Sequence, residues 1–298
     1  MSILKIKLGV FLLFLAVAAV AFAQPKINIS GTVEWDKLEI NAVVSLDMAS
    51  AGLKLPNGRV QSEALIASEY VRLIRPGILN IQVDSSSIIA DLVDRGEWNS
   101  YDVENIALQG RSVPSALSPD FTSLLAFYSL DIDGISAALI RHRLPAEIPR
   151  TLNPIAAPAY TGIIIIASED LPIHGMKSAA QVRPCLFPKI WDAGMTLIYE
   201  RNMLNPEAGI MVRYFTQQDI FASGPSGLSP EITKVVGDRP LRVFARGVFG
   251  VNPTDPIISS DDAMQIISSD ENRALLREGR VAFIVDEKML KTPLSGEQ

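Results

Sequence analysis

The sequence predicts an α+β protein, with mixed sheets and short capped helices in two halves joined by a proline-rich connector. Three patterns indicate this class. Residues 38–47 place apolar side chains at every second position, which is typical of a half-buried strand. Residues 60–74 repeat apolar side chains at the spacing of one helix face. Residues 163–166 are all isoleucine, which predicts a central strand covered on both faces.

The N-terminus has the features of a secretory signal peptide. Lys5 and Lys7 precede an uncharged run rich in Leu, Val, Phe and Ala, which ends with the small residues Ala21 and Ala23. These two alanines suit the −3 and −1 positions of signal peptidase, so we expect cleavage after Ala23 and a periplasmic mature protein. The alternative is a retained anchor, but a membrane-spanning helix needs roughly 20 apolar residues and this run is shorter.

Composition restricts the class of protein further. The chain has 298 residues, a formal net charge of −6 and one cysteine. Nonspecific binding to nucleic acid or to anionic membranes needs a basic surface, so we expect neither partner. No second apolar segment has membrane-spanning length. Cys185 lies in an apolar setting, which favours a buried, inert thiol over an intermolecular disulfide.

A cluster of prolines divides the chain. Pro145, Pro149, Pro154 and Pro158 each lack a backbone donor and disfavour helix in the residue before them. We therefore expect an extended connector at residues 145–158. It separates a first half, residues 24–144, from a sheet-rich second half, residues 159–298.

Local patterns predict the elements of the first half. A helix is expected at residues 59–74, stopped by Pro76 and Gly77. Its apolar face would consist of Val60, Ala64, Ala67, Val71 and Ile74. The other expected elements are strands near residues 27–35, 38–47, 78–83 and 121–130, and helices near 86–95, near 100–109 and after 133.

The second half adds more strands and two capped helices. Ser259 with Asp262, and Ser268 with Glu271, fit the capping box, in which a hydroxyl and an acid satisfy free helix donors. Gly279 would end the second of these helices. The further strands are expected at residues 196–199, 209–215, 241–245 and 281–285.

Few residues occur in patterns that are typical of catalysis, metal binding or cofactor binding. His142 and His174 lie in different halves without a second ligand at metal spacing, so we expect no metal site. No G-x-S-x-G nucleophile turn and no Gly-rich phosphate loop occurs. We therefore expect no catalytic residues, no cofactor and no enzymatic activity.

Two acidic pairs leave an alternative open. Asp131 with Asp133, and Asp261 with Asp262, could hold metal ions as in two-metal enzymes. The favoured interpretation is structural, because acids at the end of a strand or in the first turn of a helix already have a stabilising role.

Segments in both halves, taken in order, resemble a known family. In the first half these are residues 60–74 and the sequence Ile-Gln-Val-Asp-Ser-Ser at residues 81–86. In the second half they are residues 160–167, 184–199, 240–245 and 257–263. Together they are similar to the small outer-membrane lipoproteins, a family that includes flagellar basal-disk lipoproteins and the N-terminal part of a flagellar ring protein.

The resemblance implies an envelope protein that assembles around, or supports, a flagellar motor or a related surface structure. It brings no catalytic residues. This chain lacks the lipidation cysteine that follows the signal peptide in many relatives, and Ser168-Glu169-Asp170 replaces a basic, Gly-rich motif. A periplasmic protein held by its partners therefore fits better than one anchored to the outer membrane.

Three hypotheses about function follow. The leading one is a periplasmic structural or assembly protein, whose partners are envelope or flagellar proteins or further copies of itself. Edges of the second-half sheet would supply the interface, because unpaired strand groups template pairing. The alternatives are a periplasmic module that binds a small molecule or peptide, and a hydrolase or metal-dependent enzyme. The expected interface anchors, which could instead pack the protein's own core, are Tyr214, Phe215, Arg242 and Phe249.

Overall fold

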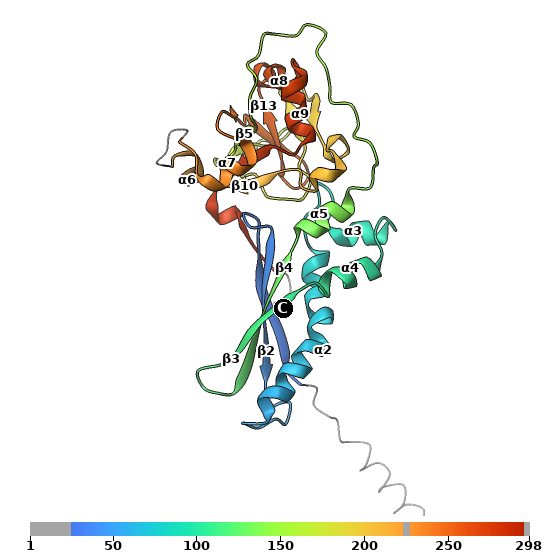
Figure 1. Ribbon diagram of the computed structural model, residues 1–298, viewed down its shortest axis with the longest axis vertical. Coiled ribbons are helices and arrows are strands. Elements are labelled where there is room, and N and C mark those ends of the chain that lie inside the picture. Colours follow the sequence, from blue (N-terminus) through green and yellow to red (C-terminus); the bar gives the residue numbers. More distant parts are fainter. Residues whose placement is uncertain (1–24, 223–226, 295–298) are drawn as a thin grey trace, which may run out of the picture.

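The computed structural model describes residues 25–222 and 227–294. The expected signal peptide, with Ala21 and Ala23, lies outside the described residues. Figure 1 shows an elongated molecule, with a long sheet and its helices at one end and the second half at the other. Helices and sheets occur in both halves, and antiparallel, parallel and mixed sheets are all present, which confirms the α+β class.

The first half is built on a five-stranded antiparallel sheet in the order β15-β1-β2-β4-β3 within the described chain. Side chains alternate along β2 as expected, with Ile40, Ala42, Val44 and Leu46 all buried. The strands are β1 (Ile27–Glu34), β2 (Glu39–Asp47), β3 (Arg111–Leu117), β4 (Ser123–Asp131) and β15 (Lys291–Pro293).

Helix α2 (Gly58–Leu79) covers the inner face of this sheet, but it differs from the expected helix in length and in face. Pro76 lies inside the helix, which continues because the following turn is buried. The expected apolar face is wrong at Val60, which is 69% exposed, and at Ala64 and Ala67, but right at Ile74, which is buried. The stripe that packs on the sheet includes Ser62 and Tyr70, and its members are Gly58, Ser62, Ile66, Tyr70, Ile74, Gly77 and Ile78.

Three short helices complete the first half: α3 (Ile89–Asp94), α4 (Ser100–Ala107) and α5 (Asp133–Leu139). The strand expected at residues 78–83 does not form, because α2 extends to Leu79 and only Gln82 makes an isolated bridge. Residues 140–162 contain no helix or strand and form a long loop beside the second half in Figure 1.

A four-stranded parallel sheet, in the order β10-β14-β5-β11, organises the second half. The expected central strand is confirmed. Ile164 packs with Ile232 and Val236, whereas Ile163 and Ile165 belong to the main core on the opposite face. The strands are β5 (Ile163–Ile166), β10 (Arg213–Phe215), β11 (Leu241–Phe244) and β14 (Val281–Ile284).

A second sheet and several helices surround this one. The sheet has the order β12-β13-β8-β9, with β8 (Ile190–Asp192), β9 (Leu197–Tyr199), β12 (Gly247–Phe249) and β13 (Asp255–Ile258). A small hairpin pairs β6 (Leu171–Pro172) with β7 (Ala179–Ala180). The helices are α6 (Gln217–Ile220), α7 (Pro230–Val236), α8 (Ser260–Ile267) and α9 (Asp270–Arg277), with 3-10 turns η1 (Arg201–Met203), η2 (Pro206–Ala208) and η3 (Glu287–Met289).

The serine caps of α8 and α9 are nearly as expected. Ser259 Oγ accepts from the Asp262 backbone N–H at 3.1 Å and caps α8. The cap of α9 is Ser269, one residue later than expected, with Asn272 in place of the acid at the third helical position. Gly279 follows α9 with a φ of +66°, a left-handed conformation that suits glycine.

The last strand leaves the second half and joins the sheet of the first. β15 pairs with Thr32, Val33 and Glu34 of β1, so residues 291–293 pack with the opposite half from the one expected for residues 159–298. Leu294 then fills a notch between two glycines. A Cβ on Gly31 would lie 2.8 Å from Leu294 Cδ1, and one on Gly77 would lie 2.6 Å from Leu294 Cδ2. This C-terminal latch, residues 291–294, ties the two halves together.

Candidate functional site

The two halves meet at the junction loop, residues 80–88, which contains the Ile-Gln-Val-Asp-Ser-Ser sequence. Backbone hydrogen bonds join this loop to the second half. The Leu186 N–H donates to Gln82 O at 3.0 Å, and the Phe187 N–H donates to Val83 O at 2.8 Å. The Asn252 N–H donates to Ser85 O at 2.9 Å. The segment that carried the family resemblance in the first half therefore has a structural role at the junction.

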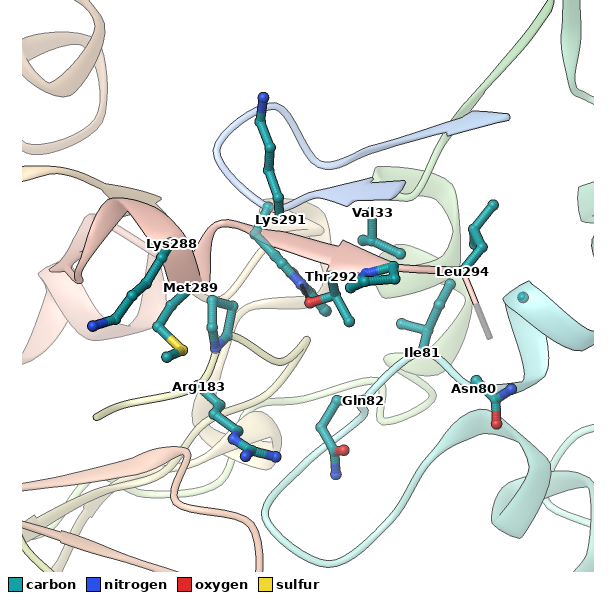
Figure 2. Close-up of a pocket in the computed structure, with 14 residues that line it drawn as sticks. Val33, Asn80, Ile81, Gln82, Arg183, Lys288, Met289, Lys291, Thr292 and Leu294 are labelled. Carbon is teal, nitrogen blue, oxygen red and sulfur yellow. Dashed lines mark hydrogen bonds between the residues drawn. The ribbon is translucent and has the colours of Figure 1, made fainter. Parts of the chain in front are cut away.

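A cavity of about 270 Å³ opens beside this loop. Its walls come from β1, the end of α2, the junction loop, the Arg183–Pro184 segment, η3 and the C-terminal latch, and Figure 2 shows the residues that line it. Trp35, Ile81, Met289 and Leu294 supply apolar surface. The Trp35 indole N–H donates to Thr292 Oγ1 at 3.1 Å, which fixes one wall. We call this space the junction cavity.

Among the residues that the structure describes, three basic side chains and no acidic one line the junction cavity. Lys288 lies 3.5 Å from Asp286, and Lys291 lies 4.0 Å from Glu34, so both ammonium groups have acidic neighbours. The Arg183 guanidinium has no ion-pair or hydrogen-bond partner among the described residues. In Figure 2 the ends of Arg183 and Gln82 lie on the same side of the cavity, and Lys291 points away.

A buried polar cluster lies behind the 185–187 segment. The Tyr214 hydroxyl donates to Cys185 O at 2.8 Å and accepts from Cys185 N–H at 3.0 Å. Asp255 Oδ1 accepts from Thr254 Oγ1 at 2.7 Å and from Lys189 N–H at 3.1 Å, while Oδ2 has no partner. Burial raises the pKa of Asp255 and of the Cys185 thiol. Cys185 is thus the expected buried thiol, protonated and inaccessible.

An apolar patch lies on the outer face of the first-half sheet, opposite α2. Cross-strand pairing places Phe127 of β4 between Val43 and Val113, and places Leu125 beside Ala116. Val113 is 51% exposed, and the other four residues are partly or fully accessible. Figure 1 shows none of the described helices on this face. We call these five residues the outer patch. Sequence reasoning missed it, although the alternation along residues 123–131 could have indicated Leu125 and Phe127.

The chain is similar to Treponema pallidum Tp0624 in both halves. Residues 26–138 match the family model of the N-terminal domain of Tp0624, and residues 162–287 match that of its second domain. No curated protein matches the chain. The outer patch lies within the segment similar to the Tp0624 N-terminal domain. The junction cavity draws residues from both matched segments and from the C-terminal latch, which lies beyond them.

Two of the four expected interface residues are buried, and the other two are accessible at the surface. β10 and β11 do form the two edges of the parallel sheet, within the segment similar to the second domain of Tp0624. Tyr214 and Phe215 on β10 are nevertheless buried in the protein's own core, so their side chains offer no surface to a partner. Arg242 on β11 is exposed. Phe249 is half-buried, with its ring centroid 5.6 Å from that of Trp191.

The residues that the sequence offered for catalysis or metal binding make contacts that stabilise the fold. His142 Nε2 lies 2.7 Å from Leu204 O, and His174 is exposed beside Phe249. Asp131 pairs with Arg111 at 2.9 Å. The others begin helices: Asp133 in α5, and Asp261 and Asp262 in α8. Within residues 25–222 and 227–294, no three His, Cys, Asp or Glu side chains gather in a group that could hold a metal ion. In the same part of the chain, no helix has the length and apolar character of a membrane span.

Proposed function

We propose that the protein is an exported structural or assembly protein of the periplasm, and that it supports a cell-envelope structure. The flagellar motor is the structure that the sequence resemblance favours. The outer patch is the observation that supports this proposal most directly. Apolar side chains that are contiguous, exposed and surrounded by polar residues mark surfaces that bind other proteins.

The geometry of the patch suits face-to-face packing of a partner. The row Val43, Phe127 and Val113 crosses three neighbouring strands without a charged residue. Polar and charged residues follow at the ends of the strands, where Arg111 pairs with Asp131. None of the five patch residues belongs to the core clusters of the described chain. An apolar centre with a polar rim is the usual anatomy of a protein–protein interface.

Addition of a partner strand to the edge of the first-half sheet explains partner binding less well. The outer edge of the first-half sheet is β3, which contains Pro114 and a register shift between Val113 and Ala116. Proline removes a strand donor, and irregular pairing interrupts the ladder, so both features oppose the addition of another strand. We therefore expect partners to pack on the face of the sheet.

The test uses a photo-crosslinking amino acid in place of Ser45, which lies opposite Leu125 on the same face. In living cells we expect crosslinks to an envelope or flagellar protein, or to a second copy of the chain. Phe127→Asp and Val113→Asp should each abolish them and impair swimming, because a charge in the patch opposes desolvation.

Val251→Asp is the matched control, since Val251 is 86% exposed and lies in the second half. It should leave crosslinking and swimming unchanged. Circular dichroism of each variant establishes that it folds. Unaltered crosslinks and normal swimming with folded Phe127→Asp and Val113→Asp variants would contradict the proposal.

A periplasmic binding module is the second candidate. It is favoured by one observation, the junction cavity with its apolar walls and with Arg183, whose guanidinium has no partner within the described part of the chain.

A further inference from the structure

We propose that the junction cavity binds a small amphiphilic carboxylate, with its aliphatic part against Trp35 and Ile81 and its carboxylate on Arg183. The proposal is independent of the outer patch. A fatty acid and the C-terminal residue of a peptide share this chemistry, and the experiment below distinguishes them.

The size of the cavity limits the ligand. A volume of about 270 Å³ corresponds to roughly nine waters at about 30 Å³ each. Sites for drug-sized molecules usually range from about 300 to 1,000 Å³. A ligand with about ten non-hydrogen atoms, such as octanoate, therefore fits, whereas a long lipid or a nucleotide does not.

The walls favour an aliphatic group. Trp35 and Ile81 are almost fully buried, and Val33 and Leu294 stand beside them. The indole N–H of Trp35 is already bonded to Thr292 Oγ1, so this wall offers no free donor to a polar ligand. Met289 adds a flexible side chain that can adjust to an alkyl chain.

Arg183 is the cavity group best placed to receive a carboxylate. The Gln82 amide N–H₂ already donates to Asp84 O at 2.6 Å and to Ser87 O at 3.1 Å. Lys288 and Lys291 have acidic neighbours, as described above. The Arg183 side chain is exposed, and its guanidinium has no partner among the described residues. A guanidinium pairs with a carboxylate through two parallel hydrogen bonds. No acidic residue in the described part of the chain lines the cavity, so none of these residues competes with the ligand carboxylate.

Binding would connect the two halves. Val33 and Ile81 come from the first half, Arg183 from the second, and Leu294 from the latch. A ligand that binds only when these parts are assembled stabilises the folded state by RT ln(1 + c/Kd), which increases with the ligand concentration c. Occupancy of the cavity would therefore strengthen the junction.

The experiment measures binding of octanoate to the full mature protein by calorimetry and by the shift in melting temperature. Octanol and octylamine test the need for a negative charge. N-acetyl-Leu-Leu and its C-terminal amide test whether the ligand is the C-terminus of a peptide. We expect octanoate to bind and to raise the melting temperature, while octanol and octylamine bind at least tenfold more weakly. Stronger binding of the acetylated peptide than of octanoate would support the carboxylate site and identify a chain end as the ligand.

Arg183→Gln should weaken carboxylate binding at least tenfold without changing the melting temperature of the unliganded protein. Arg143→Gln is the matched control, since Arg143 is exposed and lies outside the cavity, and it should bind as the wild type does. Three results would overturn the proposal. They are no carboxylate binding, equal binding of octylamine, and equal binding by Arg183→Gln.

Discussion

At the scale of single residues, Asp255 combines complete burial with incomplete hydrogen bonding. Its Oδ1 accepts from Thr254 and Lys189, whereas Oδ2 has no partner. Burial raises the pKa of the carboxyl, because a charge is poorly solvated inside the protein. The folded protein therefore holds this proton more tightly than the unfolded chain does.

This raised pKa determines the sign of a pH effect. Above the ordinary pKa of aspartate, the folded state binds more protons than the unfolded state, so stability falls as pH rises through the folded-state pKa. Asp255→Asn keeps an oxygen for Thr254 and Lys189 and cannot ionise. We predict that the variant loses less stability than the wild type between pH 4.5 and 7.5.

Urea unfolding at several pH values measures this difference. Asp120→Asn serves as the control, because Asp120 is exposed and its pKa is lowered by hydrogen bonds from Ser118 and Thr122. Its substitution should leave the stability difference between pH 4.5 and 7.5 nearly unchanged, because a lowered pKa affects stability mainly below the ordinary pKa of aspartate. A wild type and an Asp255→Asn variant with parallel stability curves would show that the carboxyl titrates normally.

At the scale of elements, the C-terminal latch packs closely on α2 because Gly77 has no side chain. Gly77 lies inside α2, where alanine is normally favoured by about 1 kcal/mol. A Cβ at this position would meet Leu294 Cδ2 at 2.6 Å. Helix propensity and packing therefore act in opposite directions on Gly77→Ala.

A double-mutant cycle separates the two effects. We predict that Gly77→Ala stabilises the protein by up to about 1 kcal/mol in a Leu294→Ala background, where only helix propensity acts. In the wild-type background the change should be less favourable, by a coupling energy of about 0.5–3 kcal/mol. Denaturant unfolding of the four proteins gives the coupling energy. Additive effects would mean that Leu294 does not fill the notch.

The same elements show what sequence patterns can and cannot predict. The isoleucine run of β5 and the alternation of β2 were predictable. In β5 consecutive apolar residues are buried, and in β2 every second residue is buried. The buried face of α2 was missed, since Ser62 and Tyr70 do not count as apolar in a pattern, whereas Val60 does. β3 and β15 were missed because exposed edge strands carry little apolar signal.

The candidate sites were less predictable than the fold. The capping serines could be located to within one residue, because capping depends on local sequence. The junction cavity depends on Trp35, Arg183 and Leu294 coming together, and no local pattern records such long-range contacts. Tyr214 was correctly placed on an edge strand, but its burial depends on how the 185–187 segment folds over it.

At the scale of the whole molecule, the halves are joined by the junction loop and by the C-terminal latch. We predict that deleting residues 291–298 lowers the urea midpoint and splits one unfolding transition into two. The deletion leaves the edge of β1 unpaired and removes part of the contact between the halves.

Tryptophan fluorescence can follow both halves, because Trp35 and Trp98 lie in the first and Trp191 in the second. Sedimentation should also show self-association of the deletion protein through the exposed edge. The control is Lys291→Ser, which keeps the strand. A monomeric deletion protein with a single, unshifted transition would mean that the latch contributes nothing to the junction.

The pairing of β1 with β15 also determines the order in which the strands of the first-half sheet can form. A ribosome makes residues 27–34 long before residues 291–293, with which they pair. The first half can form its helices and four of its strands early, but the fifth position beside β1 stays empty until residues 291–293 are available to pair. During this interval the chain must avoid incorrect pairing of the open strand, which residues 291–293 then cover.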